Sequence, residues 1–261
     1  MTDFIKNKYI KLNSKIKLLV FISIALMLIV LIIVILLFNG IIWFNNPSQK
    51  HYPVRGVDVS SYQGEIDWGI LSKQGVTYAF IKATEGSTYQ DEKFQYNWSE
   101  ANKTDLKIGA YHFFSYDSSG KSQAENFINT VPVSINILPP VVDIEFYGDK
   151  NKNLPNKAET TKNLDELLLR LEQHYNKKPI IYATMKSYNL YIKDTYTDYP
   201  IWIRDVIRKP KLQPNLSWTF WQYSNRAKLD GYTGKETFID MNVFNGTQNE
   251  FESMFYNNNP N

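Results

Sequence analysis

The sequence predicts an α/β fold, an irregular (β/α) barrel of about eight strands preceded by one transmembrane helix. Three observations lead to this prediction. A long uncharged apolar run stands near the N-terminus, and from residue 54 onward short β-rich runs alternate with helical stretches. The last of these runs are joined by linkers that are too short for full helices. We therefore expect a barrel whose late crossover helices are missing.

The N-terminal part of the chain divides into three segments. Residues 1–17 hold five lysines and one aspartate, which predicts a basic, cytoplasmic N-terminus by the positive-inside rule. Residues 18–38 are uncharged and apolar, about 31 Å long as a helix, which is enough to cross the hydrocarbon core of a bilayer. This length favours a retained anchor over a cleaved signal peptide, whose apolar stretch is shorter and ends at small residues. Residues 39–53 are predicted to be a polar juxtamembrane linker to an extracytoplasmic domain.

The barrel domain is predicted over residues 54–250, followed by a C-terminal tail at 251–261. Its strands are expected at eight short apolar runs, 55–59, 77–83, 107–113, 140–144, 179–182, 200–203, 218–222 and 238–243. Helices are expected near 67–74, 91–103, 121–129 and 157–176, the last with leucines at helical spacing. The late linkers 209–217 and 225–237 contain Pro, Gly and Asn instead.

Composition argues against several classes of protein. The chain has no cysteine, which excludes disulfide scaffolds, thiol catalysis and cysteine-based metal sites. Its three histidines form no HxH, HxxxH or HExxH pair, so a histidine-rich zinc site is not expected. Residues 50–261 carry 24 basic and 25 acidic side chains, a balance that argues against nucleic-acid binding.

Polar side chains gather at the predicted carboxyl ends of the strands, where barrels of this kind build their active sites. Four of them are acidic: Asp58, Asp143, Glu145 and Asp240. Buried acids cost several kcal/mol each unless they are paired or hydrogen-bonded, so their convergence indicates a function. The other polar or aromatic residues at these ends are Ser60, Lys82, Glu85, Tyr111, His112, Tyr182, Trp202, Arg204, Gln222 and Asn242.

Asp143 and Glu145 are the most informative pair. Because side chains alternate along a strand, both point to the same face. Two close carboxyls raise one pKa, which leaves one of them protonated near neutral pH. The protonated carboxyl can donate to a leaving glycosidic oxygen while the ionised one stabilises positive charge on the sugar or on a participating acetamido group. Such pairs also cap helices or bind cations, so the pair alone leaves these roles open.

Aromatic residues beside the strand ends favour a carbohydrate ligand, because sugar rings stack on Trp and Tyr. Tyr62, Tyr111 and Trp202 are candidates for this role, and Tyr62 is predicted to bind substrate. Phe220 and Trp221 are expected to fill the core, since only alternate strand residues face the barrel interior.

Blocks spread over residues 54–246 resemble, in order, those of the family 25 glycoside hydrolases, the Chalaropsis-type lysozymes. The first block is RGVDVSSYQG at 55–64, followed by IDW at 66–68. Later blocks lie at 80–86, 109–113, 142–145, 181–182, 202–203, 221–224 and 239–242. One departure follows Trp202 and Ile203, where relatives usually have a small residue and often a tyrosine but this chain has Arg204 and Asp205. We expect this pair to reshape one wall of the groove.

The resemblance implies an N-acetylmuramidase that hydrolyses the β-1,4 bond between N-acetylmuramic acid and N-acetylglucosamine in peptidoglycan, without a metal or cofactor. It implies that Glu145 is the general acid and that Asp143 assists, either by orienting the acetamido group or by stabilising a charged intermediate. Asp58 and Asp240 match acidic residues that flank the cleavage site. The positions that line the groove are Lys82, Tyr111, Tyr182, Trp202 and Gln222. Glu85 has two interpretations, a groove residue or a loop salt bridge.

The expected partners are peptidoglycan strands and, through the N-terminal helix, a membrane. Nucleic acid is not expected as a partner. The chain is expected to be a monomer. Two other functions compete with hydrolysis by a muramidase. One is a catalytically silent module that tethers the membrane to the wall, against which the intact Asp143 and Glu145 argue. The other is a chitinase-type enzyme, whose DxxDxDxE motif would require earlier aspartates that are missing before Asp143.

Overall fold

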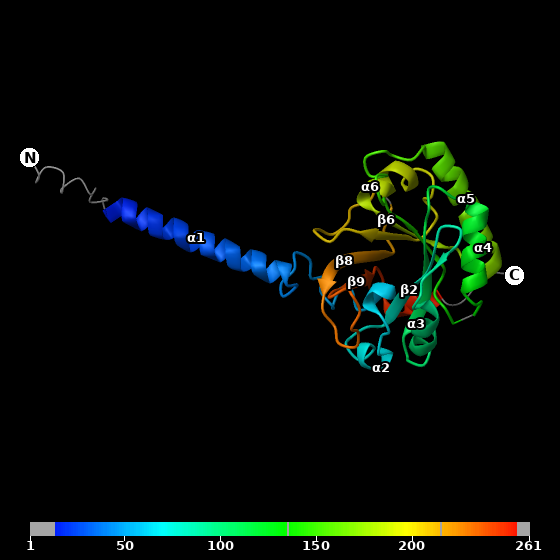
Figure 1. The fold of residues 1–261 in the computed structure, drawn as a ribbon, viewed down its shortest axis with the longest axis horizontal. Helices are drawn as coiled ribbons and strands as arrows, with labels where there is room; N and C mark the ends of the chain where they lie inside the picture. Colours follow the sequence, from blue (N-terminus) through cyan, green and yellow to red (C-terminus); the bar gives the residue numbers. More distant parts are fainter. Residues whose placement is uncertain (1–13, 135, 215, 255–261) are drawn as a thin grey trace, which may run out of the picture. The chain divides into compact units, whose positions relative to one another are not determined.

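The computed structural model describes residues 14–134, 136–214 and 216–254. The chain forms two compact units, Met1–Trp43 and Phe44–Asn261. The described part of the first unit is dominated by one helix, α1 (Ser14–Phe38), and the second unit contains the barrel (Figure 1). Within α1, the stretch Lys15–Phe38 contains an 18-residue segment with a mean hydropathy of 3.6, none of which is buried. Its length and composition suffice to cross a membrane.

Eight strands close the barrel, as the sequence predicts. They are β1 (Arg55–Val59), β2 (Tyr78–Glu85), β4 (Lys107–Phe113), β5 (Val141–Ile144), β6 (Ile180–Thr184), β7 (Ile201–Arg204), β8 (Phe220–Ala227) and β9 (Ile239–Phe244). In the ring, each of the strands β1, β2, β4, β5, β6, β7 and β8 is parallel to the next. Strand β9 lies between β8 and β1 and is antiparallel to both. A short strand that was not predicted, β3 (Tyr89–Gln90), pairs with β2 outside the ring. The described residues between β7 and β9 contain no helix, which confirms the irregular barrel.

The expected helices are all present, although two are shorter than predicted. They are α2 (Trp68–Leu71), α3 (Phe94–Ala101), α4 (Gly120–Thr130) and α5 (Lys157–Tyr175). The start of α3 is delayed because the Asp91 carboxylate accepts from the backbone N–H groups of Ser61, at 2.9 Å, and Lys93, at 3.0 Å. Further short helices, η1 (Ser61–Gln63), α6 (Met185–Ser187), the π-helix η2 (Tyr188–Ile192) and α7 (Gln248–Ser253), were not predicted.

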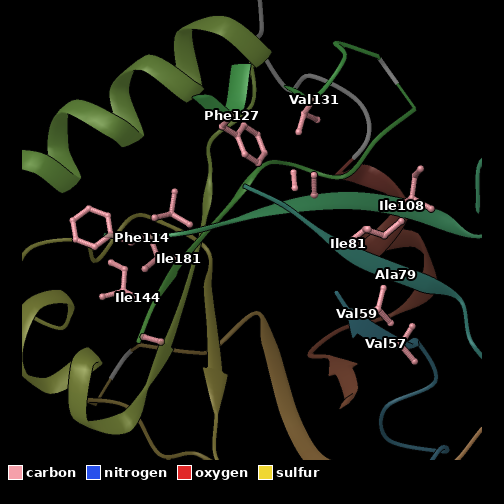
Figure 2. Packing of buried hydrophobic residues seen from close by; sticks show 14 of the residues in the cluster. Val57, Val59, Ala79, Ile81, Ile108, Phe114, Phe127, Val131, Ile144 and Ile181 are labelled. Carbon is pink, nitrogen blue, oxygen red and sulfur yellow. The ribbon is translucent and has the colours of Figure 1, made fainter. Parts of the chain in front are cut away.

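Side-chain alternation sorts the apolar residues into two layers. One layer lies between the strands and the surrounding helices, and Figure 2 shows part of it, including Val57, Ile81 and Phe127. The other fills the barrel interior with large rings, among them Phe80, Trp202 and Phe220. The expectation that Phe220 and Trp221 belong to the core is confirmed, on opposite faces of β8. Because apolar rings pack the interior, the polar strand ends form the open end of the barrel.

The predicted linker 39–53 is only partly a linker, because its second half packs on the barrel. Pro47 is buried and its carbonyl oxygen accepts from the guanidinium of Arg55. The Tyr52 ring lies 5.7 Å from the ring of Trp218 and 6.4 Å from that of Trp221. These contacts place residues 44–53 in the barrel unit, on a side where the late crossover helices are missing.

The predicted boundary between barrel and tail at residue 250 falls inside α7. Thr247 caps this helix with a reciprocal pair of hydrogen bonds to Glu250, and Phe251 is fully buried against Phe220 and Phe244. Residues 251–253 therefore belong to the barrel. The rest of the predicted tail, 255–261, lies outside the described residues.

Close packing of α4 on α5 depends on Gly120. A Cβ atom at this position would collide with the backbone carbonyl oxygen of Asn163. We expect Gly120→Ala to lower the free energy of unfolding by about 1–3 kcal/mol, because backbone atoms must shift to accommodate the methyl group. Urea unfolding followed by tryptophan fluorescence measures this change. Lys121→Ala, an exposed change one residue later, should leave stability within about 0.5 kcal/mol, and equal effects of the two changes would contradict this packing account.

Candidate active site

The carboxyl ends of the parallel strands surround a cavity of about 540 Å³. Because odd and even residues face opposite sides of each strand, the side chains that reach this cavity come from alternate positions. Nine of the ten predicted site residues line it: Asp58, Tyr62, Lys82, Tyr111, Asp143, Glu145, Tyr182, Trp202 and Asp240. The structure therefore brings nine of the ten predicted residues together around one cavity.

Asp58 and Asp240 face each other across the β1–β9 pair. The amide nitrogen of Gln222 donates to both oxygens of Asp58, at 3.0 and 3.1 Å, and to Asp240 at 3.1 Å. Asn242 also donates to Asp58, at 2.6 Å. Burial raises the pKa of Asp240 well above its ordinary value, and the neighbouring charge of Asp58 adds to this effect. Burial raises the pKa of Asp58 as well, but that of Asp240 is raised more strongly.

Asp143 and Glu145 form the second acidic pair, at the end of β5. Burial raises the pKa of Asp143 well above its ordinary value, and the nearby Glu145 raises it further. Burial also raises the pKa of Glu145, but Arg204 opposes that rise. The Asp143 side chain is the deeper one, and its Oδ1 atom has no hydrogen-bond partner among the described residues. Glu145 is partly exposed in the cavity.

Two cations stand beside these acids. Lys82 forms an ion pair with Glu85 at 2.7 Å and lies 4.9 Å from the centre of the Phe113 ring. Its charge lowers the pKa of Asp143, against the effect of burial. Arg204 lines the cavity and likewise opposes the raised pKa values of Glu145, Asp58 and Asp240. The cavity is therefore polar, with its negative charge partly balanced.

Gln222 has a different place from the one predicted. It is almost fully buried and does not line the cavity. Instead, its amide oxygen accepts from the Tyr182 hydroxyl at 3.1 Å while its nitrogen bridges the acids. Trp202 is anchored in a similar way, because its indole nitrogen donates to Asn242 at 2.9 Å. Gln222 thus holds the acids in position from behind the cavity wall.

The cavity lining also excludes Glu85, His112 and Asp205. Glu85 was expected to be either a groove residue or part of a salt bridge, and it forms a salt bridge with Lys82. His112 is buried on the opposite face of β4, where it contacts Thr84 at 2.7 Å and Gln123 at 3.0 Å, and burial lowers its pKa to about 4. Arg204 and Asp205 are the two residues that depart from the family pattern, and only Arg204 lines the cavity. The Asp205 carboxylate instead accepts from two backbone N–H groups of its own loop.

One wall of the cavity was not assigned to the site from the sequence. Arg226, Glu236 and Phe238 line this wall, and the Arg226 guanidinium lies 4.3 Å from the centre of the Phe238 ring. Strand β8 continues to Ala227 rather than ending at Gln222, because two shifts of register let it keep pairing with β9. The polar run after Gln222 resembles a loop in sequence, so it gave no signal of a strand.

The raised pKa of Asp240 has a consequence for stability. Because the folded-state pKa exceeds the unfolded one, stability falls as the pH rises from about 4 through the folded pKa. Asp240→Asn stays neutral throughout, so we expect it to raise the melting temperature by a few degrees at pH 7 and by less at pH 4. Thermal unfolding at both pH values measures this difference, with the exposed Asp105→Asn as control. A lower melting temperature at pH 7 would contradict the account.

No group of three or more histidine or acidic side chains is arranged to hold a metal ion within residues 14–134, 136–214 and 216–254. The site is a ring of carboxyls, amides and aromatic rings with three cations in its lining, Lys82, Arg204 and Arg226. Such a ring can donate and accept protons and can stabilise positive charge.

Comparison with known proteins agrees with this geometry. The sequence matches the glycosyl hydrolases family 25 over residues 57–232. The structure of a family 25 glycosyl hydrolase from Bacillus anthracis is 55% identical and has a TM-score of 0.74, over 77% of this chain and 93% of that one. A bacterial lysozyme from Streptomyces coelicolor is 30% identical with a TM-score of 0.70, over 78% and 97% of the two chains. Lysozyme M1 from Streptomyces globisporus is 31% identical over 74% of this chain and 68% of its own length. The chain therefore belongs to family 25 of the glycosyl hydrolases.

Proposed function

We propose that this chain is a membrane-anchored lysozyme, an N-acetylmuramidase that hydrolyses the β-1,4 bond between N-acetylmuramic acid and N-acetylglucosamine in peptidoglycan. The observation that carries the proposal is the pair of carboxyls, Asp143 and Glu145, at the end of β5 in a cavity large enough for sugar rings. The lysozymes to which the chain is similar support the choice of substrate.

In this proposal Glu145 is the general acid. Its longer, partly exposed side chain can reach a glycosidic oxygen, whereas Asp143 is buried deeper. As the bond between C1 and the glycosidic oxygen breaks, Glu145 gives its proton to that oxygen. Asp143 assists by orienting the acetamido group of the substrate or by stabilising the positive charge at C1. Water then adds to C1 and its proton returns to Glu145, which completes the hydrolysis. The bound sugar contacts the aromatic residues that line the cavity: Tyr62, Tyr111, Tyr182 and Trp202.

The proton must move to Glu145 before the reaction. Burial raises the pKa of Asp143 more strongly than that of Glu145, so before substrate binds we expect Asp143 to be the protonated member of the pair. A substrate acetamido N–H that donates to Asp143 favours its ionised form and lowers its pKa. Binding of the sugar thus shifts the proton from Asp143 to Glu145, which prepares the acid only when the substrate is in place.

The function is tested by the products. Full-length protein in detergent is incubated with purified peptidoglycan, and the soluble fragments are reduced with borohydride and identified by mass spectrometry. A muramidase yields fragments that end in reduced N-acetylmuramic acid. Fragments that end in reduced N-acetylglucosamine would contradict the proposed bond. The absence of fragments while the protein sediments with the wall would indicate the silent tether instead.

We further propose that α1 is retained as an anchor, with residues 1–17 in the cytoplasm and the barrel outside. The five lysines before the apolar run support this orientation, and the mean hydropathy of α1 supports insertion. Because the chain has no cysteine, Ser48→Cys provides a single thiol for a membrane-impermeant maleimide. Labelling in intact cells, with full-length protein in the alkaline-washed membranes, is expected. A shorter protein in the medium would indicate a cleaved signal peptide.

A further inference from the structure

The connection between β7 and β8 contacts the segment through which the chain enters the barrel unit. The side-chain amide of Asn45 donates to the backbone oxygen of Asp205 at 3.4 Å. Farther along the same connection, the Lys209 ammonium lies 5.5 Å from the centre of the Tyr52 ring and 5.8 Å from that of Trp218. Contacts between residues 160 positions apart therefore hold this connection beside residues 44–53.

The chain between the apolar helix and Asn45 is very short. Backbone hydrogen bonds continue past the end of α1, since Ile41 and Ile42 both donate to the carbonyl oxygen of Leu36, at 2.9 and 3.4 Å. Three residue steps then separate Ile42 from Asn45, and these can span at most about 11 Å. The lipid headgroup region is roughly 5–8 Å thick on each side of the bilayer. If α1 spans a membrane, Asn45 and Asp205 must lie at or just above the headgroups, whatever the orientation of the barrel.

From Asp205 onward the connection between β7 and β8 is basic and includes an exposed apolar residue, Ile207. We call residues 205–211 the basic loop. Ile207 is 66% exposed, and the neighbouring Arg208, Lys209 and Lys211 are also exposed. Asp205 is the only acidic residue of the loop, and its carboxylate accepts from the backbone N–H groups of Ile207 and Arg208, both at 3.1 Å. Its Oδ2 atom also lies 3.5 Å from the Arg208 guanidinium, whose side chain remains 83% exposed. Three basic side chains against one acidic side chain leave the loop with an excess of two positive charges. An exposed isoleucine among three cations matches the surface of an anionic bilayer.

We propose that the basic loop docks on anionic lipid headgroups of the membrane in which the chain is anchored. Ile207 enters the boundary between headgroups and acyl chains, and Arg208 and Lys211 pair with lipid phosphates. This inference rests on the proposed anchoring by α1. Since Arg204 lines the cavity and directly precedes the loop, docking holds the rim of the cavity beside the membrane. The enzyme would then act on glycan strands close to the membrane surface.

Site-specific fluorescence quenching tests the docking. Because the chain has no cysteine, Ile207→Cys can carry a single bimane label in otherwise unchanged full-length protein. The matched control is Leu169→Cys, at a 54% exposed position on α5, on the other side of the barrel from β8 (Figure 1). Both proteins are reconstituted into vesicles of phosphatidylcholine with or without phosphatidylglycerol, with a nitroxide on the lipid headgroup as quencher. An alkaline carbonate wash measures anchoring separately.

In vesicles with phosphatidylglycerol, we expect the label at position 207 to lose several-fold more fluorescence than the label at position 169. This difference should shrink in 1 M salt and in the variant Arg208→Gln with Lys211→Gln, since each basic residue strengthens binding to an anionic surface roughly fivefold. Equal quenching at both positions, in protein that resists the wash, would overturn the docking but leave the anchor intact. Equal docking on vesicles of phosphatidylcholine alone would overturn the choice of anionic lipid. Release by the wash would overturn the anchoring and the docking with it.

Discussion

Glu145→Gln is expected to lower the rate of peptidoglycan hydrolysis about 10²–10⁴-fold, with little change in substrate binding. Glutamine keeps the size and polarity of the side chain but has no acidic proton to give to the glycosidic oxygen. The loss should therefore appear in kcat, while KM and sedimentation with the cell wall stay close to those of the wild type. Release of reducing ends over time measures the rate.

The control for this change is Glu92→Gln, which alters an exposed glutamate outside the cavity and should leave the rate unchanged. Folding is checked by the melting temperature, which should not fall, because the pKa of Glu145 is raised by burial and a neutral side chain is tolerated there. A Glu145→Gln protein that keeps more than about a tenth of the activity would remove Glu145 from the acid role.

The second large effect is expected for Asp143→Asn. Asparagine cannot carry the negative charge that orients the acetamido group or balances the charge at C1, so kcat should fall about 10²–10³-fold. At the same time the melting temperature at pH 7 should rise. Burial of Asp143 raises its pKa, so ionising it costs stability as the pH rises above about 4, and the neutral amide avoids that cost.

These opposite changes in activity and stability distinguish a catalytic carboxylate from a structural one. A structural aspartate, once replaced, would lower both quantities together. The exposed Asp105→Asn provides the baseline, with both quantities expected to stay within error of the wild type. A fall in melting temperature with Asp143→Asn at pH 7 would contradict the account of this site.

The sequence predicted the strands well because their signal is local. The bounds of β1 and β4 agree with the prediction to the residue, and α5 begins at residue 157, as predicted. The acidic residues were found for the same reason: a charged residue at the end of an apolar run is visible without any structure. Alternation along each strand then placed Asp58, Asp143 and Asp240 in one cavity.

Features that depend on distant contacts could not be predicted in this way. The packing of residues 44–53 on the barrel depends on Trp218 and Trp221, more than 160 positions away, so the polar composition of the segment suggested a free linker. Gln222 was assigned to the substrate groove through the family resemblance, yet its side chain is almost fully buried and bonded to Asp58 and Asp240. The late part of β8 and helix α7 depend in the same way on partners elsewhere in the fold.

A crystal structure of the Glu145→Gln protein with an oligosaccharide of alternating N-acetylglucosamine and N-acetylmuramic acid tests the central claim most directly. We expect a glycosidic oxygen on the reducing side of an N-acetylmuramic acid within about 3 Å of the side chain at position 145, and the acetamido N–H of that sugar donating to Asp143. A chain whose glycosidic bond lies instead against Asp58 and Asp240, with Asp143 facing no sugar, would contradict the assignment of the catalytic pair.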